Sequence, residues 1–145
     1  MDRPVTEETP HRIVNPETLE APIGYSHAVV AAPGRTIYLA GQTGTRADGT
    51  LVGESLLDQF NQASANVVEA LTAAGGRPEH LVSMLIFVTD VEEYRDARRE
   101  FGVIYKKRFG SHYPAAALLG VSGLFDRDAK VEVVCVAVVP ESAHK

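Results

Sequence analysis

The sequence contains a single cysteine, Cys135, so no disulfide bond within the chain can hold the fold together. Cys135 lies in the apolar run VEVVCVAVV, which predicts a small buried side chain. A reactive thiol would need a partly exposed, electropositive setting, which this run does not offer. Stability must therefore come from a hydrophobic core.

Long apolar runs and clusters of basic residues are absent as well. No stretch is long enough to span a bilayer, and the N-terminal segment MDRPVTEETPHRIV has no signal-peptide core. The formal net charge is -5, whereas nucleic-acid-binding proteins normally carry a basic stripe that contacts phosphates. We therefore expect a soluble, cytoplasmic protein that binds neither nucleic acid nor membranes.

What is present is the composition of one globular domain. The chain has 145 residues, of which 45% are hydrophobic, and its charged residues are interspersed. Residues 1–20 are polar and aperiodic, which predicts an extended N-terminal arm. Residues 21–145 are predicted to form a single domain.

Hydrophobic periodicity and turn residues predict an α+β fold with the order β-β-(β)-α-β-α-β-β. The two helices are expected to cover one face of a mixed sheet. The expected elements are a hairpin of strands Ser26–Ala32 and Arg35–Gly41, a short strand at Leu51–Val52, a helix opened by Ser55 and closed by Gly75, a strand at Leu81–Asp90, a helix from Asp90 to Gly110 with Glu93 completing a capping box, and strands at Ala115–Val121 and Lys130–Val139.

The long strands are apolar on both faces, although two helices can cover only one. In the last strand, valines alternate with Cys135 and Ala137, and in the middle strand Leu81, Leu85 and Phe87 are expected to share one face. Exposing that face would leave an apolar patch larger than a soluble monomer normally tolerates. We therefore predict a closed homo-oligomer.

Six short motifs, in the same order and with fitting spacing, resemble the Rid family (YjgF-like proteins). They are APIGYSHAV, IYLAGQTG, the helix ending AAGG, LIFVTDVEEY, YPAAALLGV and KVEVVCVAV, and the likeness runs from about Val14 to Pro140. The resemblance implies a chorismate-mutase-like subunit, a homotrimer with a central barrel-like core, and sites in clefts between subunits. It also implies hydrolysis of enamines or imines to a carbonyl compound and ammonia, with no metal or cofactor.

The resemblance places the family's catalytic glutamate at Glu132 and its pocket tyrosine at Tyr25. Glu132 would position water and move a proton, and Tyr25 would orient the substrate. The residues alone leave other interpretations open. Glu132 could be a solvated or ion-paired carboxylate, and Tyr25 could be a packing residue at the start of a strand.

Six further positions are predicted to bind substrate, and one of them is Ala116, at the start of the strand Ala115–Val121. Gly41 would let the substrate lie against the backbone because it has no Cβ, and Gln42 follows it. Two residues after Tyr25, His27 would share its face, although a lone strand histidine is more often structural. Arg98 lies where the family has an asparagine, but it also fits a solvated helix face. Tyr113 is expected at the rim of the pocket, where it could equally help to end a helix.

Ala116 is the most informative departure from the family pattern. The deaminases carry an arginine there, whose fork grips the substrate's α-carboxylate with two hydrogen bonds. Ala40 likewise replaces a family serine. The predicted function is therefore enamine or imine hydrolysis at clefts between subunits, on a substrate without an α-carboxylate. The alternative is a non-catalytic trimer that binds a small metabolite. Ribonuclease activity, the family's older description, is not expected because the chain lacks a basic patch.

Overall fold

The computed structural model describes residues 8–141 of the chain. Its elements are, in chain order, β1 (Arg12–Val14), β2 (Ala28–Val30), β3 (Gly34–Tyr38), α1 (Leu56–Ala73), the short 3-10 helix η2 (Pro78–His80), β4 (Leu81–Val88), α2 (Val91–Asp96), α3 (Arg98–Phe109), β5 (Ala115–Gly120) and β6 (Val131–Pro140). None of these described helices combines the length and apolarity needed to cross a membrane.

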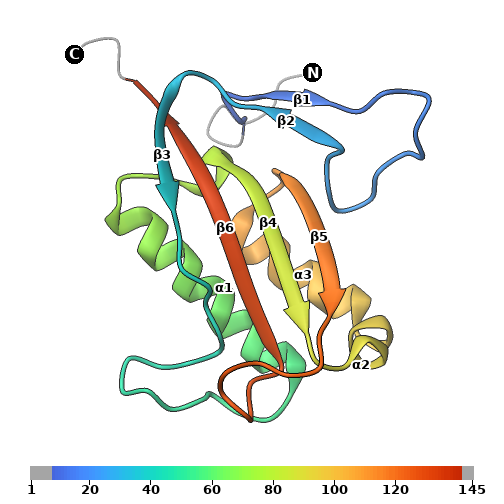
Figure 1. Ribbon diagram of the computed structural model, residues 1–145, viewed down its shortest axis with the longest axis vertical. Helices are drawn as coiled ribbons and strands as arrows, with labels where there is room; N and C mark the ends of the chain where they lie inside the picture. Colours follow the sequence, from blue (N-terminus) through green and yellow to red (C-terminus); the bar gives the residue numbers. More distant parts are fainter. Residues whose placement is uncertain (1–7, 142–145) are drawn as a thin grey trace.

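Four strands form the main sheet in the order β3-β6-β4-β5. The β3–β6 and β6–β4 pairs are antiparallel, and β4 and β5 are parallel, with Met84 opposite both Cys135 and Ala116. Both α1 and α3 lie against the same side of this sheet, behind it in Figure 1. The predicted mixed sheet with helices on one face is confirmed.

The core lies between the sheet and the helices α1 and α3. Ser55 caps α1 by accepting a hydrogen bond from the Asp58 amide at 3.0 Å, and Gly75 follows the helix with φ of +97°. Both ends were predicted. The helix buries Phe60 and Leu71 completely, and Cys135 faces it from β6. Burial raises the pKa of the Cys135 thiol to about 12, which confirms an inert core residue.

The predicted hairpin of the first two long strands is wrong. In the structure β2 pairs with β1, which lies in the predicted arm, while β3 pairs with β6. The ten residues of β6 offer a partner to every residue of β3. Gly34 makes the approach possible because a Cβ there would lie 2.7 Å from the Val139 carbonyl carbon. The expected strand at Leu51 is reduced to one bridge with Thr45.

The predicted second helix is two helices, because α2 ends and α3 begins around Ala97. Ala97 has φ of −111° and ψ of 19°, outside the helical range. The capping prediction holds in part: Asp90 accepts a hydrogen bond from the Glu93 amide at 3.1 Å. The Glu93 carboxylate instead accepts from the Leu56 amide and pairs with Lys130 at 3.2 Å.

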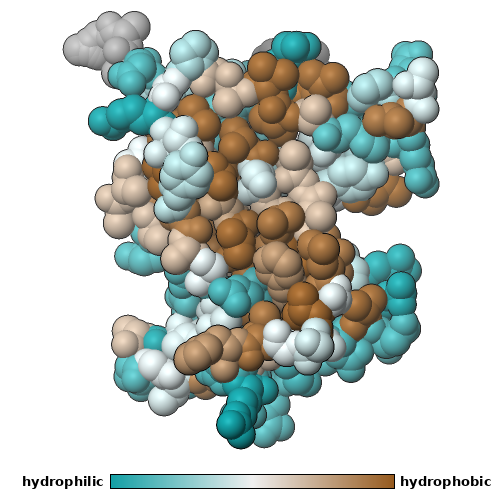
Figure 2. All heavy atoms as spheres, in the orientation of Figure 1, coloured by the Kyte–Doolittle hydropathy of each residue, from teal (hydrophilic) through white to brown (hydrophobic). Residues whose placement is uncertain are grey.

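The side of the sheet opposite the helices, here called the open face, carries apolar side chains in the single chain. Tyr38 is 81% exposed, Leu85 36% and Leu119 42%, and a hydrophobic band runs down this face in Figure 2. The prediction that Leu81 shares this face is wrong. The register shifts between Leu81 and Ser83, and Leu81 is fully buried in the core.

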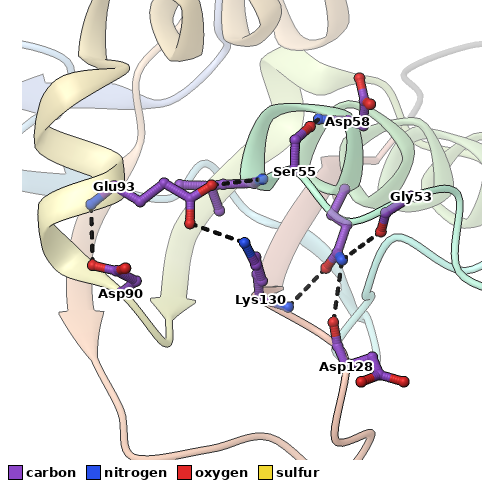
Figure 3. Close-up of polar contacts among 9 residues, drawn as sticks. Gly53, Ser55, Asp58, Asp90, Glu93, Asp128 and Lys130 are labelled. Atoms are coloured by element: carbon purple, nitrogen blue, oxygen red, sulfur yellow. Dashed lines mark hydrogen bonds and ion pairs between the residues drawn. The ribbon is translucent and has the colours of Figure 1, made fainter.

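A buried glutamine, Gln59, joins α1 to the loop before β6, and its partners Gly53, Asp128 and Lys130 are labelled in Figure 3. The Gln59 amide nitrogen donates to the carbonyl oxygens of Gly53 at 2.8 Å and Asp128 at 3.2 Å, and its oxygen accepts from the Lys130 amide at 2.7 Å. Gln59 has no exposed surface. The two loops that flank the start of β6 are therefore fixed by one side chain.

Candidate functional site

Glu132 projects from the open face of β6, directly opposite Phe87 on β4, and is half-buried. Its carboxylate lies against Gly41. A Cβ on Gly41 would overlap the Glu132 carboxylate oxygen and would lie 2.9 Å from the carboxyl carbon. The absence of a side chain at Gly41 is therefore what gives the glutamate its present position.

Gln42 fixes the backbone beside this carboxylate. Its amide donates to the Val133 carbonyl, and its carbonyl accepts from the Val133 amide, each at 2.9 Å. Its side-chain nitrogen donates to the Ala40 carbonyl at 3.4 Å. The structure thus brings Gly41 against Glu132 on the open face, and the next residue, Gln42, pairs with Val133, which belongs to the core.

Tyr25 lies elsewhere in the single chain, beside the start of β5. The Ser26 amide donates to the Pro114 carbonyl at 3.1 Å, and the Ser26 hydroxyl donates to the Tyr113 carbonyl at 2.5 Å. These bonds hold the segment before β2 against β5. They explain how Tyr25 and Tyr113, far apart in the sequence, come to line the same cavity.

That cavity, of about 630 Å³, lies among the segment before β2, strands β4 and β5, and helices α2 and α3. Tyr25, Tyr113, Ala116 and Arg98 all line it, so four predicted site residues meet here. Its volume lies within the range of small-molecule sites. Among the described lining residues only Arg98 is charged, and Arg98 is exposed to solvent.

Glu132 is not among the residues that line this cavity. Glu132 lies opposite Phe87, whereas Ala116 lies opposite Met84, and successive positions of a strand point to opposite sides. One chain therefore holds two half-sites: Glu132 with Gly41 on the open face, and Tyr25 with Arg98 in the cavity.

His27 contacts Tyr25, as its spacing predicted. The two rings meet edge to face with centroids 5.2 Å apart. However, the His27 ring nitrogen Nε2 is bonded to the Glu20 carbonyl at 2.7 Å, and the His27 amide donates to Asn15. His27 thus ties the arm to Tyr25, and it is not among the residues that line the cavity.

Tyr113 lines the cavity, whereas the preceding residue, His112, is buried. The His112 Nε2 atom donates to the Leu81 carbonyl at 2.7 Å, and the Tyr105 hydroxyl donates to the His112 carbonyl at 2.7 Å. Burial lowers the pKa of His112 from its usual 6.5. This histidine is a buried structural group that joins the chain before β5 to the start of β4.

Three aromatic residues that line the cavity were not predicted as site residues: Tyr94, Phe101 and Tyr105. The sequence indicated them only as the apolar stripe of a helix. Tyr105 stacks on Tyr113 with ring centroids 4.9 Å apart. The signal that could have identified them is the excess of hydroxyl-bearing rings on a stripe that aliphatic residues normally fill.

Among residues 8–141, no three His, Cys, Asp or Glu side chains gather as possible metal ligands. The donors in the two half-sites are a carboxylate, phenols, backbone groups and one guanidinium. Such a set can position water, move a proton and pair with an anion.

Comparison with known proteins gives a consistent result. The family model described as Endoribonuclease L-PSP matches residues 16–139. A 2-iminobutanoate/2-iminopropanoate deaminase of Capra hircus is 33% identical over 129 residues, which cover 88% of this chain and 89% of that protein. Protein HMF1 of Saccharomyces cerevisiae is 31% identical over 104 residues, which cover 72% of this chain and 76% of HMF1.

Among solved structures, the Rid-family protein YyfB of Yersinia pestis, described as being of unknown function, has a TM-score of 0.78 and 33% sequence identity. The likeness covers 89% of this chain and 98% of YyfB. These matches span nearly the whole described fold and include the residues of both half-sites. They show that the chain belongs to the Rid (YjgF) family, whose model is described as Endoribonuclease L-PSP.

Proposed function

We propose that this protein hydrolyses an enamine or imine to a carbonyl compound and ammonia. Membership of the family and the deaminases among its relatives support this reaction type. The observation that carries the proposal is the half-buried Glu132 carboxylate held against Gly41 on the open face. That position places a proton-transfer group on the open face of the sheet. In the single chain the carboxylate itself occupies the space beside Gly41 where substrate was predicted to lie.

The chemistry needs only water, a carboxylate and orientation. Glu132 takes a proton from water as the oxygen adds to the carbon of the C=N bond. That proton then passes to nitrogen and gives an addition product with a hydroxyl and an amino group on one carbon. Glu132 next carries the hydroxyl proton to nitrogen as the C–N bond breaks, so ammonia leaves and the carbonyl forms. An enamine enters the same sequence after its tautomerisation to the imine. Tyr25 orients the substrate through its hydroxyl. No step requires an oxidant, a reductant or a cofactor.

We further propose that the two half-sites meet across an interface in a closed homotrimer. Tyr38, Leu85 and Leu119 leave the open face apolar in the single chain, which favours its burial against another subunit. Assembly through this face would bring Glu132 of one subunit toward the cavity of the next, because Glu132 lies on that same face.

The proposed substrate has no α-carboxylate, because β5 offers no side chain that could bind one. Ala116 offers only a methyl group to the cavity, and Ala40 offers no hydroxyl beside Gly41. Losing a buried, charge-assisted pair weakens binding by about 30-fold to several thousand-fold. Ala116→Arg should accordingly raise keto-acid formation from imines of amino acids above that of the wild type.

The test is ammonia release from a panel of imines generated in solution, with and without an α-carboxylate. Wild type should exceed the uncatalysed rate, and Glu132→Gln should lower the excess by about a hundredfold or more. Glu69→Gln changes an exposed carboxylate of α1 in the same way and should leave the rate unchanged. Equal rates for wild type and Glu132→Gln on every imine would reject the proposal.

The second candidate is a trimer that binds a small metabolite without catalysis. It is favoured by the cavity itself, whose walls are largely apolar and which lies apart from Glu132 in the single chain. Native mass spectrometry of protein purified from cells would distinguish the two. A retained small molecule together with no ammonia release from any imine would establish the binder.

A further inference from the structure

The cavity beside β5 has an aromatic lining and one cation. Four tyrosines and one phenylalanine line it, and Arg98 is the one charged residue among its described lining residues. The Tyr105 hydroxyl is engaged with the His112 carbonyl, and the Tyr105 ring stacks on the ring of Tyr113. Such walls suit an aromatic or branched apolar body rather than a sugar or a peptide.

Arg98 differs from its neighbour Arg95 in whether its guanidinium forms an ion pair with a carboxylate. Arg95 forms an ion pair with Glu92 on the exposed side of α2. Among residues 8–141 no carboxylate forms an ion pair with Arg98, and no acidic residue lines the cavity. A cavity with an uncompensated guanidinium favours anionic ligands and disfavours cations.

The position of this charge is as informative as its sign. Arg98 lines the cavity from the first residue of α3, whereas Ala116 lines it from β5. Arg98 therefore contacts a different part of the ligand from a side chain on β5. An anionic group held by Arg98 would be separated from the β5 side by the apolar body of the ligand.

We propose that this cavity binds a small molecule with an apolar or aromatic body and one terminal carboxylate, and that the carboxylate pairs with Arg98. Calling this ligand the substrate rests on the proposed function, and Arg98 is then the residue that determines its class: an imine or enamine whose carboxylate is remote from the C=N carbon. The binding itself does not depend on that reaction.

The protein carries its own optical probe for this test. It has no tryptophan and five tyrosines, and four of them, Tyr25, Tyr94, Tyr105 and Tyr113, line the cavity. Tyrosine fluorescence of the full chain is titrated with 3-cyclohexylpropanoate, which does not fluoresce, and with its neutral amide. Wild type should bind the acid more tightly than the amide, and added salt should weaken only the acid.

Arg98→Gln should weaken binding of the acid by about fivefold, the upper end for an ion pair open to solvent, and leave the amide unchanged. Arg98→Lys keeps a charge and should retain a preference for the acid. Arg95→Gln is the matched control on the neighbouring turn and should bind both probes as the wild type does. Thermal unfolding of each variant establishes that it is folded.

Equal affinity of wild type for acid and amide, no binding of either, or unchanged acid binding by folded Arg98→Gln would overturn the inference. Failure of the proposed function has a separate signature. Acid preference that depends on Arg98, with no ammonia release from any imine, would reject the hydrolase and keep this inference. Ammonia release that depends on Glu132, with no effect of Arg98 substitutions on the binding of either probe, would keep the hydrolase and reject this inference.

Discussion

Two glycines in the segment after β3, Gly41 and Gly44, would respond differently to an added methyl group. At Gly41 the change should affect activity, and at Gly44 it should affect stability. Gly41 faces the end of the Glu132 side chain, whereas Gly44 faces the backbone of α1, where a Cβ would lie 2.6 Å from the Gln59 Cα atom. A side chain can rotate away from a new methyl group, but a helix backbone cannot do so without strain.

Gly41→Ala is expected to displace the Glu132 carboxylate and to lower ammonia release by about a hundredfold, as small misplacements of catalytic groups do. Its free energy of unfolding should change by less than about 1 kcal/mol, because only a side chain must move. Rate assays and urea unfolding measure the two effects. Gly44→Ala should cost about 1–3 kcal/mol of stability. A Gly41→Ala protein with full activity would show that the carboxylate position is unimportant.

At this scale the sequence offered candidate site residues but could not group them. Glu132 was predicted as a catalytic residue and Gly41 as a substrate-binding residue, and the two lie together. Tyr25 reaches the cavity only because Ser26 bonds to the chain before β5, a contact across 87 residues that no local pattern encodes. The sequence favoured a solvated helix position for Arg98, because periodicity indicates only which face of a helix is apolar. It does not show that the first residue of α3 borders a cavity.

Among the elements, α1 depends on Gln59 more than on any cap. Gln59→Leu would leave the Lys130 amide and the carbonyls of Gly53 and Asp128 without their partner (Figure 3). We expect a loss of about 2–4 kcal/mol in the free energy of unfolding, measured by urea titration. Gln62→Ala removes one bond, to Asn66, at a partly exposed site of the same helix and should cost less than about 1 kcal/mol. Similar losses for both variants would contradict this.

The connection from η2 to β4 should make stability depend on pH. Burial lowers the pKa of His112 and of His80 below the usual 6.5, so the unfolded chain binds protons at a higher pH than the folded chain does. Their contribution is complete above about pH 6.5 and declines as the pH falls below it.

The measurement is the free energy of unfolding between pH 7.5 and 5. It should fall for wild type and fall less steeply for His112→Gln, which keeps a side-chain donor near the Leu81 carbonyl but cannot titrate. Equal slopes for the two proteins would show that His112 is not one of the titrating groups.

The elements themselves were largely predictable where one signal dominated. Ser55 and Gly75 mark the ends of α1, and Asp90 starts α2, as capping residues do. The break at Ala97 was missed because alanine is the best helix former and the apolar stripe continues across it. The false hairpin arose because local turn chemistry at Pro33 was given more weight than pairing with β6, which depends on contacts about 100 residues away.

For the whole molecule, substitutions on the open face can test assembly without disturbing the folding of the single chain. Leu85 is 36% exposed there and Val103 is 65% exposed on α3, so a carboxylate at either position reaches water in one chain. Leu85→Asp should stay folded but fail to assemble, because the interface would bury an unpaired charge. Val103→Asp should assemble as the wild type does.

Sedimentation equilibrium of the three proteins at micromolar concentration measures the assembled mass, and circular dichroism confirms that each is folded. A wild type with the mass of one chain would reject the proposed trimer. A Leu85→Asp protein with the wild-type mass would place the interface elsewhere.

The strand order also constrains when this chain can fold during its synthesis. β6 is the last strand made, yet it lies in the middle of the sheet, between β3 and β4. While residues 131–140 are still inside the ribosome, β3 has no partner in the sheet and only the parallel β4–β5 pair is available. The apolar strands must wait unpaired until that segment emerges, so their exposure to aggregation and to chaperones is set by the rate of translation and not by the stability of the finished fold.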